Sequence, residues 1–105
     1  MTIEQTMYEA TRQHQAGWLA EAEQLYQQIL RQQPSHPEAL QLLGVLKHQQ
    51  GQSGRAVELI GRAIALRPNS FRAHSNWGEA LRILGRLDEA IADHRRAVAL
   101  GPGQA

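Results

Sequence analysis

Two histidines are the residues in this sequence whose spacing could begin a metal site. His14 and His48 lie thirty-four residues apart, and on two packed helices they would be roughly 9 Å from each other. Zinc takes three or four protein ligands, but the next residue at this spacing is Arg82, and the chain has no cysteine. We therefore expect surface histidines in contact with water, with no metal and no other cofactor.

A serine, an aspartate and two further histidines have the residue types of a nucleophilic site. They are His74, Ser75, Asp93 and His94. Such a site also needs a strained turn that presents the nucleophile and a pair of donors for the oxyanion. The sequence shows neither signal around these residues, so it predicts a chain that is not an enzyme and has no catalytic residues.

A period of thirty-four residues organises the elements that carry these side chains. Glycine, alanine, proline and a small residue all recur at this spacing. The recurring residues are Gly17, Gly51 and Gly85; Ala22, Ala56 and Ala90; Pro34, Pro68 and Pro102; and Ala10, Gly44 and Gly78. A fixed period between twenty and fifty residues indicates a stacked array. We expect one domain over residues 1–105, with repeats at about 3–36, 37–70 and 71–104.

Each repeat is expected to hold two helices, because apolar residues recur at spacings of three and four. In the first repeat these helices would cover about 3–16 and 19–32. The three recurring glycines are expected in left-handed conformation at the turn inside each repeat, and the prolines end the second helices. The small residues in the first helices, such as Gly44, predict a close approach of the two helices of a repeat.

Several polar residues are expected to cap these helices. Thr2 with Gln5, and Ser35 with Glu38, have the spacing of capping boxes. Pro37 would lie in the first turn, where its missing N–H costs nothing. The remaining predicted caps are Ser53 for the second helix of the second repeat, and Asn69 or Ser70 for the next helix.

With these residues at these positions, the whole chain resembles tetratricopeptide repeat proteins. The segments GQSGRAVELIGRAIALRPNS and GRLDEAIADHRRAVALGP are typical of that family. The resemblance implies an all-α fold, an α-solenoid of three antiparallel helix–turn–helix hairpins in a right-handed superhelix. It also implies a scaffold that binds proteins or peptides. The segments QHQAGWLAEAEQLYQQIL and HPEALQLLGVL are similar to bacterial arrays that precede glycosyltransferase-like or sulfotransferase-like domains, so the alternative is a docking or targeting segment of such a larger protein.

The resemblance implies a ligand site on the concave groove lined by the first helix of each repeat. The corresponding residues are Glu4, Met7, Thr11, His14, Glu38, Gln41, Val45, His48, Arg72, Ser75, Glu79 and Arg82. Their mixture of polar and apolar types favours an extended peptide or a partner's helix over a phosphate-rich polymer. The alternative is a face that is merely solvated.

Some family members hold a peptide carboxylate in a clamp of lysines and asparagines. The matching positions here are Met7, Thr11, Leu42, Arg72 and Asn76. Only Arg72 and Asn76 have suitable side chains, so the resemblance does not extend to this clamp.

The end of the chain suggests a second surface. Arrays of this kind end with a polar helix that covers the last hairpin, whereas this sequence stops at Gln104 and Ala105. The last helix would then present an apolar strip to water, formed by Ile91, His94, Ala97 and Val98. Either the chain is a fragment of a longer protein, or this strip pairs with another copy.

Charge and hydropathy set the remaining expectations. The net charge is +1, which argues against binding to nucleic acid or to an anionic membrane. The first residues have no basic start followed by an apolar run, so we expect no signal peptide. No stretch approaches eighteen consecutive apolar residues. We therefore expect a cytoplasmic protein.

Overall fold

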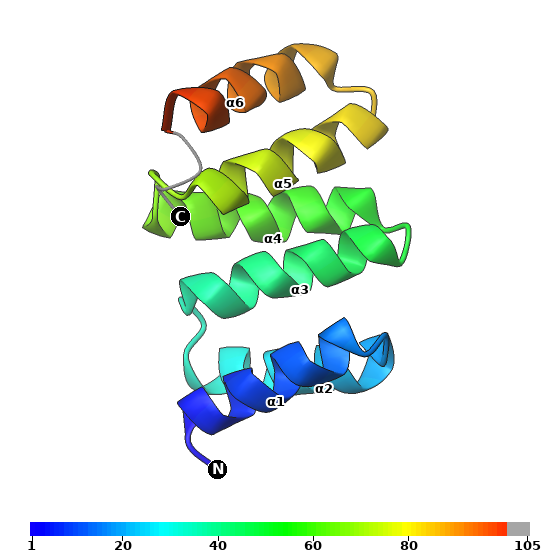
Figure 1. Ribbon diagram of the computed structural model, residues 1–105, viewed down its shortest axis with the longest axis vertical. Helices are drawn as coiled ribbons and strands as arrows, with labels where there is room; N and C mark the ends of the chain where they lie inside the picture. The colour runs from blue at the N-terminus through cyan, green and yellow to red at the C-terminus, as the bar shows by residue number, and fades with distance from the viewer. Residues whose placement is uncertain (101–105) are drawn as a thin grey trace.

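The computed structural model describes the backbone of residues 1–100 and all of their side chains except those of residues 87–92 and 94. Within this part of the chain the fold is an all-α solenoid, in which three antiparallel hairpins stack one upon another (Figure 1). The helices are α1 (Ile3–Gln15), α2 (Leu19–Gln32), α3 (Pro37–Gln49), α4 (Ser53–Leu66), α5 (Phe71–Ile83) and α6 (Leu87–Leu100). In the described residues, none of them is long and apolar enough to cross a membrane.

The turn inside each hairpin is built in the same way. Gly17, Gly51 and Gly85 have φ values of 86°, 79° and 79°, a region that only glycine adopts without steric cost. The residue after each glycine donates its N–H to a carbonyl five residues back: Trp18 to Gln13, Gln52 to Lys47 and Arg86 to Leu81, at 2.9, 2.8 and 2.9 Å. This is the Schellman arrangement, which satisfies the last free carbonyls of a helix. The predicted glycine turns are confirmed.

Two of the predicted caps are confirmed. The Thr2 hydroxyl accepts from the N–H of Gln5 at 3.1 Å, and the Gln5 side chain accepts from the N–H of Thr2 at 2.8 Å. Ser70 caps α5 by accepting from the N–H of Ala73 at 3.2 Å. Both caps place a side-chain oxygen on an N–H that the helix itself leaves without a partner.

The predicted caps at Ser35 and Ser53 are wrong. Pro37 is the first residue of α3, as predicted, so His36 is the N-cap, and its Nδ1 accepts from the N–H of Ala39 at 3.1 Å. Ser35 then lies one position before the N-cap and Glu38 is the second helical residue instead of the third, so the two do not form a capping box. Ser53 lies inside α4 and is buried, and its hydroxyl contacts His48 Nδ1 at 3.0 Å.

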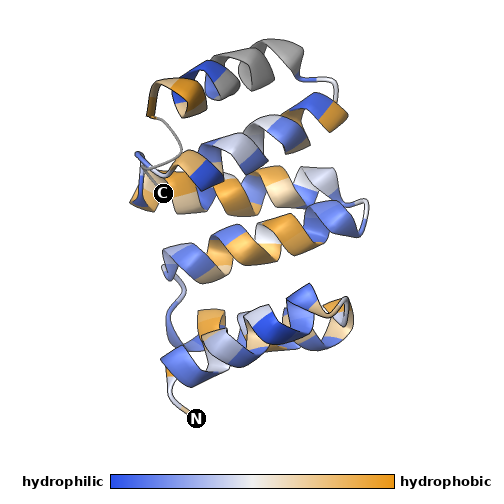
Figure 2. Ribbon diagram, in the orientation of Figure 1, coloured by the Kyte–Doolittle hydropathy of each residue, from blue (hydrophilic) through white to orange (hydrophobic). Residues whose placement is uncertain are grey.

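The core lies between the helices of each hairpin and between neighbouring hairpins. One buried cluster joins α1, α2, α3 and α4, and a second joins α4 and α5. Figure 2 shows that apolar residues are densest on α3 and α4, in the middle of the stack. The largest fully buried side chains are Tyr26, Ile29, Leu40, Leu46, Leu59, Ile60, His74 and Leu81. The middle hairpin is thus covered on both sides, as stacking requires.

Gly44 allows the two helices of the middle hairpin to lie close together. A Cβ added at Gly44 would lie 2.4 Å from Ile60 Cγ1 and 3.3 Å from the carbonyl oxygen of Ala56. Ile60 is fully buried, so it has little room to move aside. The close approach predicted from the recurring small residues is confirmed at this position.

Candidate functional site

A pocket of about 210 Å³ opens between the start of α3 and the start of α5. The end of α4 and the turn that follows it form the rest of the wall. Its lining residues are Pro37, Glu38, Gln41, Leu42, Ala63, Arg67, Ser70, Arg72 and Ala73. We call it the α3–α5 pocket. Ala63 occupies the place where the first repeat has Ile29 and so leaves space between the helices.

A second pocket of about 320 Å³ lies between α1 and α3. Its lining residues are Thr11, His14, Gln15, Tyr26, Leu42 and Gln49. We call it the α1–α3 pocket. Leu42 lines both pockets, so its side chain lies between them and forms part of each wall. The two pockets include residues from the first helices of all three repeats, and we refer to the two together as the groove.

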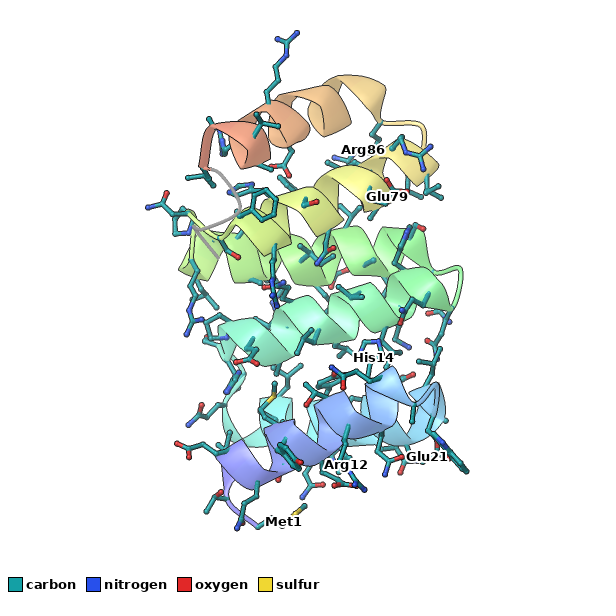
Figure 3. The ribbon with its side chains drawn as sticks, in the orientation of Figure 1. Met1, Arg12, His14, Glu21, Glu79 and Arg86 are labelled. Carbon is teal, nitrogen blue, oxygen red and sulfur yellow. The ribbon has the colours of Figure 1, made fainter. Side chains whose placement is uncertain are left out.

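His14 is held at the edge of the α1–α3 pocket (Figure 3). Its Nε2 lies 2.6 Å from Gln49 Oε1 and its Nδ1 lies 2.8 Å from the hydroxyl of Tyr26. An amide oxygen only accepts, so Nε2 donates and Nδ1 is left to accept from the phenol. The expectation of a solvated histidine is therefore wrong for His14, because its ring joins α1 to α2 and α3.

Tyr26 contributes a buried phenol to the same pocket. Burial raises the pKa of Tyr26 from 10.0 to about 12, and the negative charge of Glu38 adds to this rise. The His14 and Tyr26 rings meet edge to face, with centroids 5.7 Å apart, a favourable geometry for an aromatic pair. The phenol therefore remains protonated at physiological pH.

Of the groove residues expected from the sequence, five line the two pockets. Thr11 and His14 belong to the α1–α3 pocket, and Glu38, Gln41 and Arg72 belong to the α3–α5 pocket. The Thr11 hydroxyl donates to the carbonyl oxygens of Met7 and Tyr8, at 3.0 and 2.9 Å. The proton of the Thr11 hydroxyl is therefore already used, so toward a ligand in the pocket this hydroxyl acts as a weak hydrogen-bond acceptor.

The other expected groove residues line neither pocket. Met7 is only 8% exposed and belongs to the hydrophobic core, so its assignment to a ligand surface is wrong: α1 turns this position toward the other helices. Glu79 and Arg82 form an exposed ion pair, with Arg82 Nη2 2.5 Å from Glu79 Oε1. The remaining residues outside the two linings are Glu4, Val45, His48 and Ser75, together with Asn76 of the clamp positions.

Sequence reasoning missed several residues that line the groove, notably Arg67, Ser70 and Gln49, and it considered Leu42 only as a clamp position. Leu42 and Gln49 lie on the first helix of the second repeat, but not on the stripe that was assigned to the groove. Arg67 and Ser70 lie at the junction of two repeats. Both residues lie within two positions of Pro68 in the sequence, but no sequence pattern indicated that they would lie opposite α3.

His14 and His48 each make hydrogen bonds within the protein. His48 contacts Ser53, and His14 contacts Tyr26 and Gln49. Among the residues that the structure describes, no three histidines, aspartates or glutamates are grouped so that they could hold a metal ion.

His74 and Asp93 form a buried pair away from the groove. His74 Nδ1 lies 2.5 Å from Asp93 Oδ1, and its Nε2 lies 2.5 Å from the carbonyl oxygen of Pro68. A carbonyl only accepts, so Nε2 donates to it. His74 is fully buried, so no substrate reaches it. The pair instead ties α5 to α6 and to the turn after α4.

The predicted strip at the end of the chain is described only in part. Val98 is 79% exposed, as expected, but Ala97 is only 3% exposed. The prediction that Ala97 is exposed is therefore wrong. Neighbouring positions on a helix face different directions, so Ala97 does not share the exposure of Val98. The side chains of Ile91 and His94 lie outside the described residues, as does the helix end predicted at Pro102.

Comparison with known proteins identifies the family. Two family models described as tetratricopeptide repeat match residues 43–105 and 25–58. The chain belongs to the tetratricopeptide repeat family. Tetratricopeptide repeat protein 36 of Mus musculus is 38% identical over 72 residues, which are 69% of this chain and 39% of that protein. The protein O-mannosyl-transferase TMTC1 of Mus musculus is 32% identical over 93 residues, 85% of this chain and 10% of that protein.

Solved structures of other tetratricopeptide arrays have the same fold. A Thermobaculum terrenum O-GlcNAc transferase mutant is 31% identical with a TM-score of 0.92, over 95% of this chain and 19% of that one. The first tetratricopeptide domain of Spaghetti (RPAP3), bound to the HSP90 peptide SRMEEVD, is 22% identical with a TM-score of 0.90, over 95% and 79% of the two chains. This tetratricopeptide array thus has the fold of a protein-interaction scaffold and spans only a small part of the transferases that it matches.

Proposed function

We propose that this chain is a non-enzymatic scaffold whose groove binds an extended peptide or an extended segment of a partner protein. The observation that carries the proposal is the pair of adjacent pockets that share Leu42. Adjacent pockets along one line suit alternate side chains of a single extended chain. Each residue of such a chain advances by about 3.3 Å.

The groove has both apolar and polar contacts to offer. Leu42 is half-buried and supplies an apolar ridge, while Gln41 supplies an amide that is both donor and acceptor.

Selection from a phage library of random twelve-residue peptides tests this proposal. Peptides that bind are measured by fluorescence anisotropy against the wild type, Leu42→Ser and the matched control Leu66→Ser. Leu66 is an exposed leucine of α4 that lines neither pocket. We expect Leu42→Ser to weaken binding about three- to tenfold, because the ligand buries the exposed half of this leucine and complete burial contributes about 1.5–3 kcal/mol. Equal binding by the two variants, with helicity intact, would contradict the proposal.

A second candidate is a substrate-docking or targeting segment of a larger transferase. Its support is the likeness to the O-GlcNAc transferase and to TMTC1, of which this chain spans 19% and 10%. Sequencing the gene past the codon for Ala105 tests it. A transferase domain in the same reading frame would favour this candidate, and a stop codon at that point would exclude it.

A further inference from the structure

We infer that a cleft between α2 and α4 binds a phosphate monoester, at a site separate from the groove. The cleft has a volume of about 350 Å³, and we call it the α2–α4 cleft. Its lining residues are Gln27, Leu30, Arg31, Pro34, Leu43, Arg55, Leu59 and Arg62. None of them lines the α3–α5 pocket or the α1–α3 pocket, so a ligand here leaves the peptide groove open.

The lining of this cleft concentrates positive charge. It holds three of the eleven lysine and arginine residues of the chain and none of the ten aspartate and glutamate residues. The whole chain carries a net charge of only +1, so the average composition does not account for such a lining. All three arginines are exposed. The ligand that this lining favours is therefore an anion.

The three guanidinium groups keep hydrogen-bond donors for a ligand. Within the described part of the chain, the side chain of Arg31 makes no hydrogen bond or ion pair. Arg62 Nη2 donates to the carbonyl oxygen of Pro34 at 3.3 Å, which holds this side chain against the turn after α2. Arg55 Nη1 pairs with Glu58 Oε1 at 2.8 Å. A guanidinium has five N–H groups, so both bonded arginines retain several donors.

The balance of charge favours an anion with two negative charges. Glu58 lies beside Arg55, so the three arginines and this carboxylate together carry two net positive charges. Glu23 accepts from Gln27 at 3.2 Å, but its charge is balanced by Lys47 at 2.8 Å. A phosphate monoester carries nearly two negative charges and three acceptor oxygens at neutral pH. Arginine binds such oxygens through two parallel hydrogen bonds.

The base of the cleft is apolar. Leu43 and Leu59 are buried beneath it, and an apolar base lowers the local dielectric constant and so strengthens the attraction between the arginines and an anion. Leu30 is half-buried and Pro34 is exposed, so both can contact the organic group that carries the phosphate. That group is either a phosphorylated side chain of a partner protein or a free phosphorylated compound.

NMR titration of the ¹⁵N-labelled chain tests the inference. The probes are inorganic phosphate, O-phosphoserine, a phosphoserine pentapeptide with blocked ends, and acetate as a monoanion. They are added at constant ionic strength and at about pH 7.5, where a phosphate monoester is mainly a dianion. The proteins are the wild type, Arg31→Gln, Arg62→Gln, Glu58→Gln and the control Arg67→Gln. Arg67 is an exposed arginine directly after α4 that lies outside the α2–α4 cleft, so its replacement removes the same charge from another place.

We expect the three phosphate probes to cause saturable shifts of amide signals on α2 and α4. Acetate should bind about tenfold more weakly, because it supplies half the charge of the dianion. Arg31→Gln and Arg62→Gln should each weaken binding of phosphate about tenfold, since each removes a charge-assisted contact. Glu58→Gln should tighten binding, and Arg67→Gln should leave it within about twofold because salt screens a distant exposed charge.

The two phosphorylated probes identify the source of the ligand. Tighter binding of the pentapeptide than of O-phosphoserine assigns the cleft to a phosphorylated side chain of a partner protein, because the flanking peptide then adds contacts. Equal binding of the two assigns it to a free phosphorylated compound.

Three results would overturn the inference. They are shifts that do not saturate, binding of acetate as tight as that of phosphate, and a loss in Arg67→Gln as large as that in Arg31→Gln. Each of them would leave the proposed function of the groove standing, because the groove and the cleft share no lining residue. Circular dichroism of each variant shows that the fold is retained, as expected for exchanges of exposed side chains.

Discussion

At the scale of single residues, this array uses histidines to join elements. His14 connects α1 to Tyr26 of α2 and Gln49 of α3, and His74 connects α5 to Asp93 of α6 and to Pro68. An imidazole has two nitrogens on opposite sides of the ring, so it can serve two partners at once. These two histidines therefore stabilise the stack by joining neighbouring helices.

The buried phenol of Tyr26 should make the fold sensitive to alkali. The folded state raises the pKa of Tyr26 from 10.0 to about 12, so it favours the neutral phenol. The resulting stability is complete below pH 10 and is lost as the pH rises toward 12. In Tyr8→Phe, we expect phenolate absorbance to appear only near pH 12 and together with unfolding. Tyr26→Phe should show no such late transition, and titration of Tyr26 near pH 10 in the native state would contradict the prediction.

Removal of Asp93 should weaken the third hairpin strongly. Asp93→Ala leaves the buried His74 without its carboxylate partner, and an unsatisfied buried hydrogen-bonding group costs about 1–3 kcal/mol. Asp93→Asn keeps an acceptor oxygen and should cost less. Urea unfolding followed by circular dichroism measures both. A loss below about 0.5 kcal/mol for the alanine variant would show that the pair contributes little.

At the scale of helices, small residues set how closely the helices of a hairpin approach. Gly44 of α3 contacts α4 where Ile60 and Ala56 face it, and it leaves no space for a methyl group. Glycine inside a helix costs about 1 kcal/mol relative to alanine. The packing of α3 on α4 must therefore stabilise the fold by more than about 1 kcal/mol.

Two glycine-to-alanine exchanges test this balance. Gly44→Ala places a methyl group 2.4 Å from Ile60 Cγ1, and we expect a net loss of about 1–3 kcal/mol despite the better helix propensity. Gly54→Ala, inside α4, meets nothing within 4 Å and should stabilise by about 0.5–1 kcal/mol. Thermal unfolding compares the two. Stabilisation by both exchanges would contradict the close approach.

At the scale of the whole molecule, the apolar surface is unevenly shared between the hairpins. The middle hairpin is covered on both sides, whereas α1 and α2 are more polar (Figure 2). The other end presents Val98. Because Val98 is apolar and exposed on the last described helix, another hairpin can stack on this end of the array.

We predict self-association through this end. Light scattering after size exclusion, over a range of concentrations, should show dimers or larger species for the wild type and monomers for Val98→Glu. Gln28→Glu, an exposed position of α2, controls for the added charge. A wild type that stays monomeric at the highest concentration would exclude the prediction and leave the groove as the main surface.

Local rules in the sequence were enough to determine the elements. The three glycines at positive φ, the capping box at Thr2 and Gln5, and Pro37 at the start of α3 each depend on residues within one turn. The repeat period then implies the stack, because a single unit cannot bury its own apolar face. The all-α solenoid therefore followed from the residues alone.

Only the tertiary structure decided which side chains meet in the groove. Leu42 lines both pockets, Arg67 faces α3 from the end of α4, and Met7 is buried although its spacing matched the groove. These outcomes depend on how far each helix rotates when side chains of different volume pack against it. The period is the same in every repeat, but the volumes at each position are not, so the spacing alone does not determine the lining of either pocket.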